Sequence, residues 1–364
     1  MTIIVNSADS HVLEPDDLWT RNLPTKLRSG GLTVEKTADG WEHISFGDTL
    51  VRRESPAMLE RTSPPGVGDP KARISDLDDQ GVWLELLFPS RGLWLWLTDD
   101  PELAYASTRV YNEWLFDTFV RFSDRFIGTA MVSLLDVDRT VAQMHEAKEM
   151  GFDALTFPCT PPSGRQYSDP ELEPIWSAAE ELGTPLCFHV GTGADPVVAR
   201  GPGGAVINYV ETFHPAQRSV AHFVASGVLE RHPSLRLLYI EGGASWLASL
   251  CERMDEGYRQ HEIFARPKLA MLPSEYVRRQ VHASFQRDRA ALRTIDITGL
   301  DAVMFGTDYP HMEGTWPHTQ ETVEAIFEGA PAEVREAVAG GTLARIFGRS
   351  AAPTADDVLS ASRP

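Results

Sequence analysis

The sequence has few cysteines, no long apolar run and a shortage of basic residues, and each of these absences excludes a class of protein. Its three cysteines stand alone, without C-x-x-C spacing, so we expect neither a disulfide framework nor a thiolate metal site. No apolar run is long enough to cross a bilayer, and no basic segment precedes a hydrophobic one at the start. We therefore expect a cytoplasmic protein that does not bind membranes.

The charge balance excludes another kind of partner. Asp and Glu number 52 against 33 Lys and Arg, which gives a formal net charge of −19. Nucleic-acid binding depends on clustered Lys and Arg side chains. We therefore expect no nucleic-acid partner, and we assign no cationic substrate on the basis of charge alone, because acidic surfaces mainly keep proteins soluble.

Length and composition are those of a globular enzyme. The 364 residues are 42% hydrophobic and 23% charged, enough for two average domains or one large α/β barrel. No repeat and no linker divides the chain, so we predict one domain over residues 1–349. Residues 350–364 are small and polar, and we expect a flexible C-terminal tail there.

Short apolar runs alternate with stretches of helical spacing. Helices are predicted at 138–150 and 170–182, where apolar residues recur at helix-face intervals and a glycine follows each stretch. Strands are predicted at 3–10, 82–88, 126–134, 153–158, 185–190, 235–241, 281–286 and 302–307. Eight strands separated by helices indicate a (β/α)₈ barrel, with an open doubly wound sheet as the alternative. No G-x-G-x-x-G follows the first strand, which argues against a dinucleotide-binding fold.

One segment departs from this alternation. Residues 32–53 alternate apolar and polar side chains around Asp39-Gly40. Such a pattern predicts a β-hairpin inserted into the barrel.

Polar residues follow the apolar bodies of four predicted strands. Asp9 and His11 end the first, His189 the fifth, Glu241 the sixth and Asp308 the eighth. The βα loops of a barrel meet at these strand ends, and residues i and i+2 of a strand point the same way. Alone, each could be a hydrogen-bonded histidine or a turn-capping aspartate. Their shared position favours a site for Zn²⁺ or Mn²⁺.

These motifs carry a family resemblance. "SADSHVLEP", "CFHVG", "GVLERHPSLRLLYIEGGASWL" and "MFGTDYPHMEGTWP" resemble the amidohydrolase superfamily, in the branch that contains aminocarboxymuconate-semialdehyde decarboxylase. The resemblance spans residues 3–347. It implies a distorted TIM barrel that holds one divalent metal ion through Asp9, His11, His189 and Asp308. In this family the last aspartate also handles protons.

Glu241 departs from the family pattern. Decarboxylases of this branch usually carry a histidine there, so the resemblance does not transfer decarboxylation directly. Asp9, Glu241 and Asp308 could all lie near one cation, which would hold the ion tightly and make it a weaker electrophile. We assign Asp308 and Glu241 as catalytic.

Five further residues are candidates for substrate binding. Arg52 and Arg53 end the inserted hairpin, where the resemblance implies an arginine that binds a substrate carboxylate. The alternative is that both are solvated arginines on the edge of a sheet. Arg253 lies near a family arginine that reaches a neighbouring subunit's site, or is an exposed helix charge. His311 follows the eighth strand. Trp94 either lines the pocket or packs against a second subunit.

The sequence leads to a hydrolase as the first choice of function. We expect a metal-dependent enzyme that attacks a small cyclic or carboxylated molecule with a metal-activated water. The alternative is a non-oxidative decarboxylase of an aromatic or muconate-like acid. The second alternative, a metal-binding barrel without turnover, is disfavoured because the donor set is intact. We expect Zn²⁺ ahead of Mn²⁺ as the cofactor, and a homodimer or higher homo-oligomer.

Overall fold

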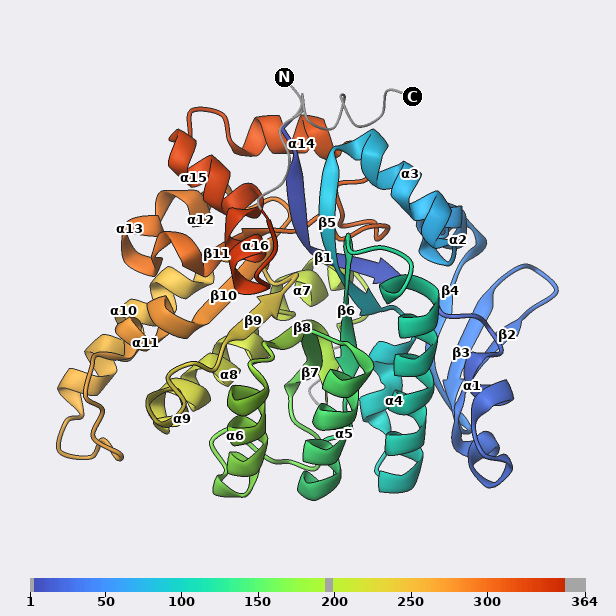
Figure 1. The fold of residues 1–364 in the computed structure, drawn as a ribbon, viewed down its shortest axis with the longest axis horizontal. Helices are drawn as coiled ribbons and strands as arrows, with labels where there is room; N and C mark the ends of the chain where they lie inside the picture. The colour runs from blue at the N-terminus through green and yellow to red at the C-terminus, as the bar shows by residue number, and fades with distance from the viewer. Residues whose placement is uncertain (1–2, 194–198, 351–364) are drawn as a thin grey trace.

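Eight parallel strands surround the centre of the computed structural model, which describes residues 3–193 and 199–350 (Figure 1). Every strand overlaps one predicted from the sequence. Their side chains are buried almost throughout, as in a sheet covered on both faces. The strands are β1 (Val5–Val12), β5 (Val82–Pro89), β6 (Phe126–Met131), β7 (Ala154–Thr160), β8 (Leu186–Gly193), β9 (Leu237–Ile240), β10 (Val281–Phe285) and β11 (Val303–Phe305).

The first and last strands close the sheet into a nearly complete barrel. They share one isolated bridge, between Ser10 and Tyr309, and the His11 amide donates to the Tyr309 carbonyl at 2.6 Å. Gly306 permits this approach, because a Cβ there would lie 2.7 Å from the Cβ of Asp9. The prediction of a distorted TIM barrel is confirmed, and the alternative of an open sheet is wrong.

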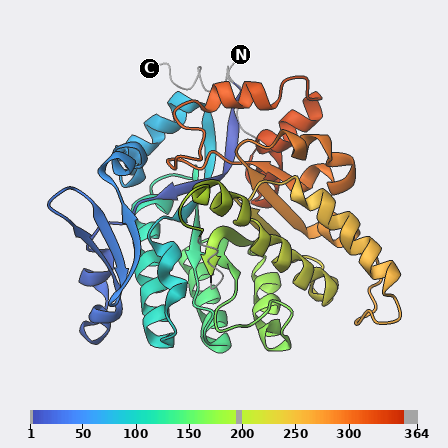
Figure 2. The same ribbon diagram turned by 180° about the vertical axis from the view of Figure 1, so that it is seen from behind.

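Helices connect the strands and cover the outside of the barrel. Figures 1 and 2 show α4, α5 and α6 side by side. Helices α5 and α6 end as predicted, at Gly151 and Gly183, whose φ angles of 112° and 61° suit glycine. The α-helices are α1 (Leu18–Asn22), α2 (Pro56–Thr62), α3 (Pro70–Gln80), α4 (Pro101–Leu115), α5 (Val137–Met150), α6 (Glu173–Leu182), α7 (Gly204–Glu211), α8 (His214–Ala225), α9 (Val228–Arg231), α10 (Trp246–Gln260), α11 (Pro273–Gln280), α12 (Arg289–Arg293), α13 (Ile295–Thr298), α14 (Thr319–Ile326), α15 (Ala332–Glu336) and α16 (Thr342–Ile346).

The insertion is a three-stranded antiparallel sheet, which corrects the predicted hairpin. Strands β2 (Leu32–Lys36) and β3 (Glu42–Phe46) flank the expected turn, and β4 (Thr49–Glu54) then pairs back onto β3. Gly47, with φ of 55°, supplies the second reversal. Figure 1 shows this sheet at one side of the barrel.

Arg91 fastens the insertion to the barrel. Its buried guanidinium lies 2.8 Å from Glu42 of β3 and 2.8 Å from Asp16. Glu14, also buried, accepts the backbone amides of Arg91 and Gly92 at 2.9 and 2.8 Å. The insertion is therefore held rigidly beside the ends of β1 and β5.

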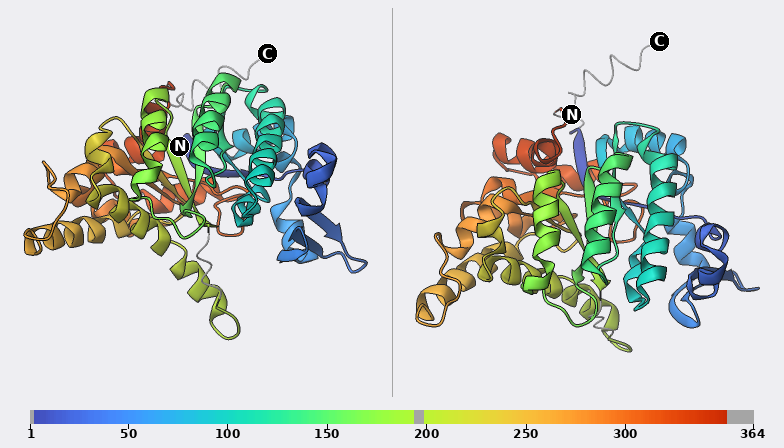
Figure 3. Two further views of the ribbon diagram at one scale, coloured as in Figure 1. Left: turned by 90° about the horizontal axis from the view of Figure 1, so that it is seen from below. Right: turned by 60° about the horizontal axis from the view of Figure 1, so that its bottom comes forward.

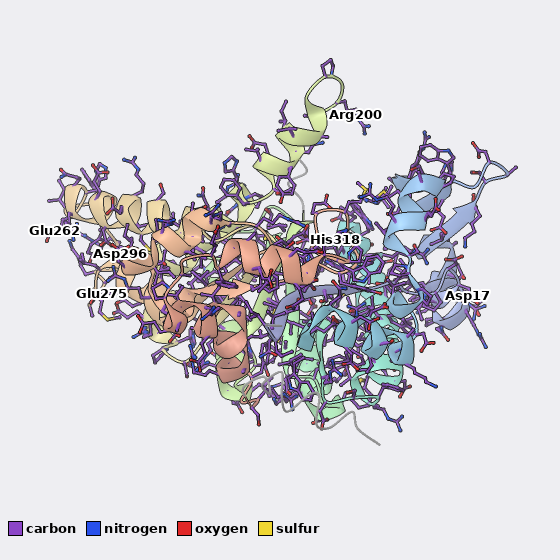
Figure 4. All side chains as sticks on the ribbon, turned by 90° about the horizontal axis from the view of Figure 1, so that it is seen from above. Asp17, Arg200, Glu262, Glu275, Asp296 and His318 are labelled. Atoms are coloured by element: carbon purple, nitrogen blue, oxygen red, sulfur yellow. The ribbon has the colours of Figure 1, made fainter. Side chains whose placement is uncertain are left out.

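Helix α7 projects away from the barrel. The left view of Figure 3 shows it extending from the body, and Figure 4 places Arg200 at the tip of this projection. No helix within the described residues is both long and apolar enough to traverse a lipid bilayer. The tail predicted at 350–364 lies, apart from Ser350, outside the described residues.

Candidate metal centre

Four strand ends bring five potential ligands together inside the barrel. Asp9 and His11 lie on β1, His189 on β8, Glu241 directly after β9, and Asp308 three residues after β11. Four of these side chains are fully or almost fully buried, and that of Glu241 is 18% exposed. Residues far apart in the sequence thus share one small interior space, as their common position at strand ends predicted.

The donor atoms of these side chains lie within a few ångströms of one another. The Nε2 atoms of His11 and His189 are 3.1 Å apart, and each lies 3.6 Å from Asp9 Oδ1. Asp308 Oδ1 lies 3.6 Å from His11 Nε2, and Glu241 Oε2 lies 3.5 Å from His189 Nε2. These separations are those of ligands arranged around a common ion.

Backbone carbonyls orient both imidazoles. His11 Nδ1 lies 2.9 Å from the Pro89 carbonyl, and His189 Nδ1 lies 3.0 Å from that of Val190. With Nδ1–H donating to its carbonyl, each ring turns Nε2 toward the centre, as in metal sites. Burial lowers the pKa of His189, but the carboxylates of Asp9 and Glu241 more than offset this and raise it. A proton therefore lies between the two Nε2 atoms, 3.1 Å apart, where a bound metal ion would replace it.

Several oxygens at the centre have no hydrogen-bond partner. Asp9 Oδ1 and both carboxylate oxygens of Asp308 are buried without a hydrogen-bond partner, although His311 Nδ1 lies 3.0 Å from Asp308 Oδ1. Gln286 Nε2 donates to Asp9 Oδ2 at 2.9 Å. Buried carboxylate oxygens are normally paired or bound to a metal, because leaving them unpaired is costly. The residues present therefore fit a divalent cation.

Electrostatics point the same way. Burial, and then the charge of Asp9, hold the pKa of Asp308 well above its ordinary value. Burial, and then the charge of Asp308, do the same to the pKa of Glu241. Burial, reinforced by His311 and His189, keeps the pKa of His11 well below its usual range, so its ring stays neutral. A cation relieves the repulsion among the carboxylates.

Two of the ligand candidates have an unusual backbone conformation. Among the described non-glycine residues, Ser163, Glu241 and Asp308 alone have positive φ angles, of 63°, 72° and 50°. Such conformations are uncommon and concentrate at functional sites. Both site residues sit where a strand gives way to a tight turn.

A cavity of about 210 Å³ opens directly onto the centre. Side chains of His189 and Glu241 form part of its wall, and its apolar residues include Leu93 and Met312. Three of the residues predicted to bind substrate line this cavity: Arg52, Trp94 and His311. That they bind substrate stays a prediction. His311 Nδ1 lies 3.0 Å from Asp308 Oδ1, and Arg52 Nε donates to Glu54 at 2.7 Å.

The other two predicted substrate-binding residues lie away from this cavity. Arg53 is exposed and points away from it, because side chains alternate along β4. Arg253 is 77% exposed on α10 and pairs with Glu256. That Arg253 reaches a neighbouring subunit, and that the protein is a homo-oligomer, stay predictions.

Sequence reasoning missed the residues that support the ligands. Gln286 immediately follows β10 and holds Asp9, yet only titratable residues were sought at strand ends. Arg73 and Glu85 form a fully buried ion pair at 2.8 Å, and Arg73 also donates to the His11 carbonyl at 3.0 Å. Glu14, beside the ligands in sequence, proves to support the loop after β5.

Comparison with known proteins places these features in context. A model of the amidohydrolase family matches residues 43–349. A 2-amino-3-carboxymuconate-6-semialdehyde decarboxylase of Dictyostelium discoideum is 24% identical over 292 residues, which are 77% of each chain.

Solved structures share the fold at lower identity. An amidohydrolase of Mycobacterium avium subsp. paratuberculosis K-10 superposes with a TM-score of 0.80 at 20% identity, over 96% of this chain and 100% of that one. A 5-carboxyvanillate decarboxylase of Novosphingobium aromaticivorans DSM 12444, with bound manganese and 3-methoxy-4-hydroxy-5-nitrobenzoic acid, gives 0.71 at 20% identity, over 95% and 97%.

Proposed function

This chain belongs to the amidohydrolase family, and from that premise we propose that it is a metal-dependent decarboxylase of a small aromatic or muconate-like carboxylic acid. Similar proteins with a stated reaction are decarboxylases, which supports the alternative function over the hydrolase that the sequence suggested first. One observation carries the proposal: unpartnered buried donors converge beside a cavity of about 210 Å³.

A divalent ion fits the centre formed by Asp9, His11, His189 and Asp308. Manganese in a structure of the same fold supports Mn²⁺ beside the Zn²⁺ expected from the sequence. When bound, the ion would supply a positive charge that attracts the substrate carboxylate and stabilises negative charge as it develops.

Asp308 is the proton donor in this proposal. Its carboxyl is fully buried beside His311, a residue of the cavity wall, and in this proposal it protonates the substrate carbon that bears the carboxylate. The bond from that carbon to the carboxylate then breaks, its electron pair returns to the ring or conjugated system, and CO₂ leaves. His311, 3.0 Å from Asp308 and 27% exposed, returns a proton from solvent to Asp308.

The cavity wall selects the substrate. Leu93, Trp94 and Met312 offer apolar and aromatic surface for a planar ring. Arg52 provides a guanidinium for a polar group on the far side of the ring. The apolar lining also limits the water that reaches the proton donor.

The reaction is tested directly on metal-loaded protein. Hydroxybenzoate-type, carboxyvanillate-type and muconate-like acids, together with lactones and amides, are incubated with Mn²⁺- and Zn²⁺-loaded enzyme and the products analysed by mass spectrometry. We expect at least one acid to lose CO₂, with activity removed by a chelator and restored by the ion. Addition of water to a lactone or amide, without CO₂ release, would instead establish the hydrolase.

Asp308→Asn tests the proton donor. An amide of the same shape cannot supply the proton, so we expect kcat to fall by about 10²-fold or more, in line with general-acid contributions. Metal content of the purified variant is measured in parallel, so that a lost proton donor is distinguished from a lost ligand. Near-native kcat would contradict the assignment.

A further inference from the structure

We propose that Glu241 is a fifth protein ligand of the metal ion, and that its carboxylate shifts the preference of the centre toward an oxygen-preferring ion such as Mn²⁺ relative to Zn²⁺. The inference rests on the proposed metal centre and is independent of which reaction the centre performs.

The position of the carboxylate is that of a ligand. Glu241 Oε2 lies 3.5 Å from His189 Nε2, which falls within the separations of 3.1 to 3.6 Å among the other donors. Glu241 also offers an oxygen that groups with oxygens of Asp9 and Asp308, all within 4.8 Å of one another. The unpartnered, fully buried oxygens of those two aspartates face the same space.

The backbone holds the side chain there against its own preference. Glu241 has a φ of 72°, a region that glycine enters freely and that a residue with a Cβ enters at a cost. The Glu241 amide donates to Ser284 Oγ at 3.0 Å, which fixes this conformation. Within the described residues, the single ion pair of its carboxylate is with the ligand candidate His189. A titratable side chain held at the centre in a strained backbone conformation indicates a functional role for that side chain.

The resulting donor set differs from that of an ordinary zinc site. Three carboxylates and two imidazoles make five donors, whereas catalytic Zn²⁺ sites commonly have three protein ligands and one open position. Carboxylate oxygens suit Mn²⁺, which favours octahedral coordination, whereas imidazole suits Zn²⁺. Glu241 supplies the additional carboxylate oxygen that distinguishes this donor set from an ordinary zinc site.

Metal affinity without substrate tests the proposal. Dissociation constants for Mn²⁺ and Zn²⁺ are measured by chelator competition on the wild-type chain, Glu241→Gln and Glu313→Gln. Glu313 lines the same cavity and is exposed, so its variant removes one nearby negative charge without removing a ligand. Electron paramagnetic resonance of bound Mn²⁺ reports the coordination of the ion directly.

We expect Glu241→Gln to weaken Mn²⁺ binding about tenfold more than Zn²⁺ binding, in the range of losses seen when metal-site groups are removed. The Mn²⁺ spectrum should change in this variant. Glu313→Gln should weaken both ions by the same small factor and leave the spectrum unchanged. Glu241→Asn, a residue that tolerates a positive φ, provides a second variant with the same expected loss if Glu241→Gln folds poorly.

Two results would overturn the inference. One is an equal loss for both ions in Glu241→Gln; the other is a Mn²⁺ spectrum identical to that of the wild type. If the ions behave as expected but no acid loses CO₂, the ligand assignment stands and the proposed reaction fails. If acids lose CO₂ but Glu241→Gln binds both ions normally, the reaction stands and the ligand assignment fails.

Discussion

Single residues at the centre depend on partners from other strands. His11 of β1 is oriented by the carbonyl of Pro89 on β5, and Asp9 by the amide of Gln286 after β10. Such partners set the position and basicity of a metal ligand as much as the ligand's own type does. The orientation of these two ligand candidates therefore depends on residues from at least two strands each.

Gln286 provides a test at this scale. Gln286→Leu leaves Asp9 Oδ2 without its donor and frees the carboxylate to rotate. We expect divalent-metal affinity to fall by about 10- to 100-fold, measured by chelator competition, with secondary structure retained by circular dichroism.

A matched glutamine lies at the other end of the same strand. Gln280 directly precedes β10 and donates to the carbonyls of His232 and Leu235, at 2.7 and 3.0 Å. Gln280→Leu should lower stability, because two buried carbonyls lose their donor, yet leave metal affinity unchanged. If both variants bind metal equally, Gln286 has no positioning role.

The ligand candidates could be found from sequence because each is polar and each follows an apolar strand body. Their grouping followed from the rule that barrel strands end on one face. Gln286 was not predicted because an amide does not titrate and is not a usual ligand of Zn²⁺ or Mn²⁺, although it too follows a strand. The ion pair between Arg73 and Glu85 was not predicted, because a pair between a helix and a strand has no characteristic spacing in the sequence.

At the level of elements, the side chains of two adjacent arginines on β4 point in opposite directions. Arg52 faces the cavity and Arg53 faces solvent, as alternation along a strand requires. Sequence alone left the two equivalent, because neither strand pairing nor facing was known.

This alternation gives a second prediction. If the substrate is an acid held partly by Arg52, Arg52→Ala removes a charged hydrogen bond worth about 1.5 kcal/mol or more, so KM should rise roughly tenfold. Arg53→Ala, one residue away, should leave KM unchanged. Steady-state kinetics on a substrate found in the product screen compares the two; an equal rise in both variants would assign the effect to the insertion as a whole.

The strands of the barrel were predictable, whereas the third strand of the insertion was not. Buried parallel strands appear as apolar runs between helices, which is how all eight were located. In the insertion, Gly47-Asp48 lies within a continuously alternating run, so the second reversal left no break in the pattern. The first turn was recognisable because the sequence has the turn-forming pair Asp39-Gly40 there. In the structure Gly40 takes a φ of 84°, which glycine adopts freely.

For the whole molecule, stability should vary with pH through a buried histidine remote from the cavity. His282 of β10 is 5% exposed and its Nδ1 lies 2.6 Å from the Asp301 carbonyl. Burial lowers the pKa of His282 from 6.5 to about 4. An unfolded chain therefore takes up this proton below about pH 6.5, whereas the native chain resists it until about pH 4.

His282 thus lowers the free energy of unfolding as pH falls through this window and has no such effect above it. The loss is about 1.4 kcal/mol per pH unit, on the order of 3 kcal/mol in all. His282→Asn keeps a donor for the Asp301 carbonyl but cannot titrate. We expect its stability to fall less than that of the wild type between pH 6.5 and 4.

Urea unfolding in the presence of a chelator measures this slope without interference from metal release. The exposed His261 on the loop after α10 supplies the control, since His261→Asn should keep the wild-type slope. Parallel stability curves for His282→Asn and the wild type would show that the buried histidine does not couple folding to pH.

The contact between β1 and β11 that closes the barrel determines when, during synthesis of the chain, the site can form. Ser7 and Thr307 hydrogen-bond across it although 300 residues separate them. The ribosome synthesises Asp9 and His11 long before it reaches Asp308. A nascent chain that stops before β11 consequently holds four of the five ligand candidates but lacks Asp308, so that we expect activity only after β11 and the loop that follows it have been made.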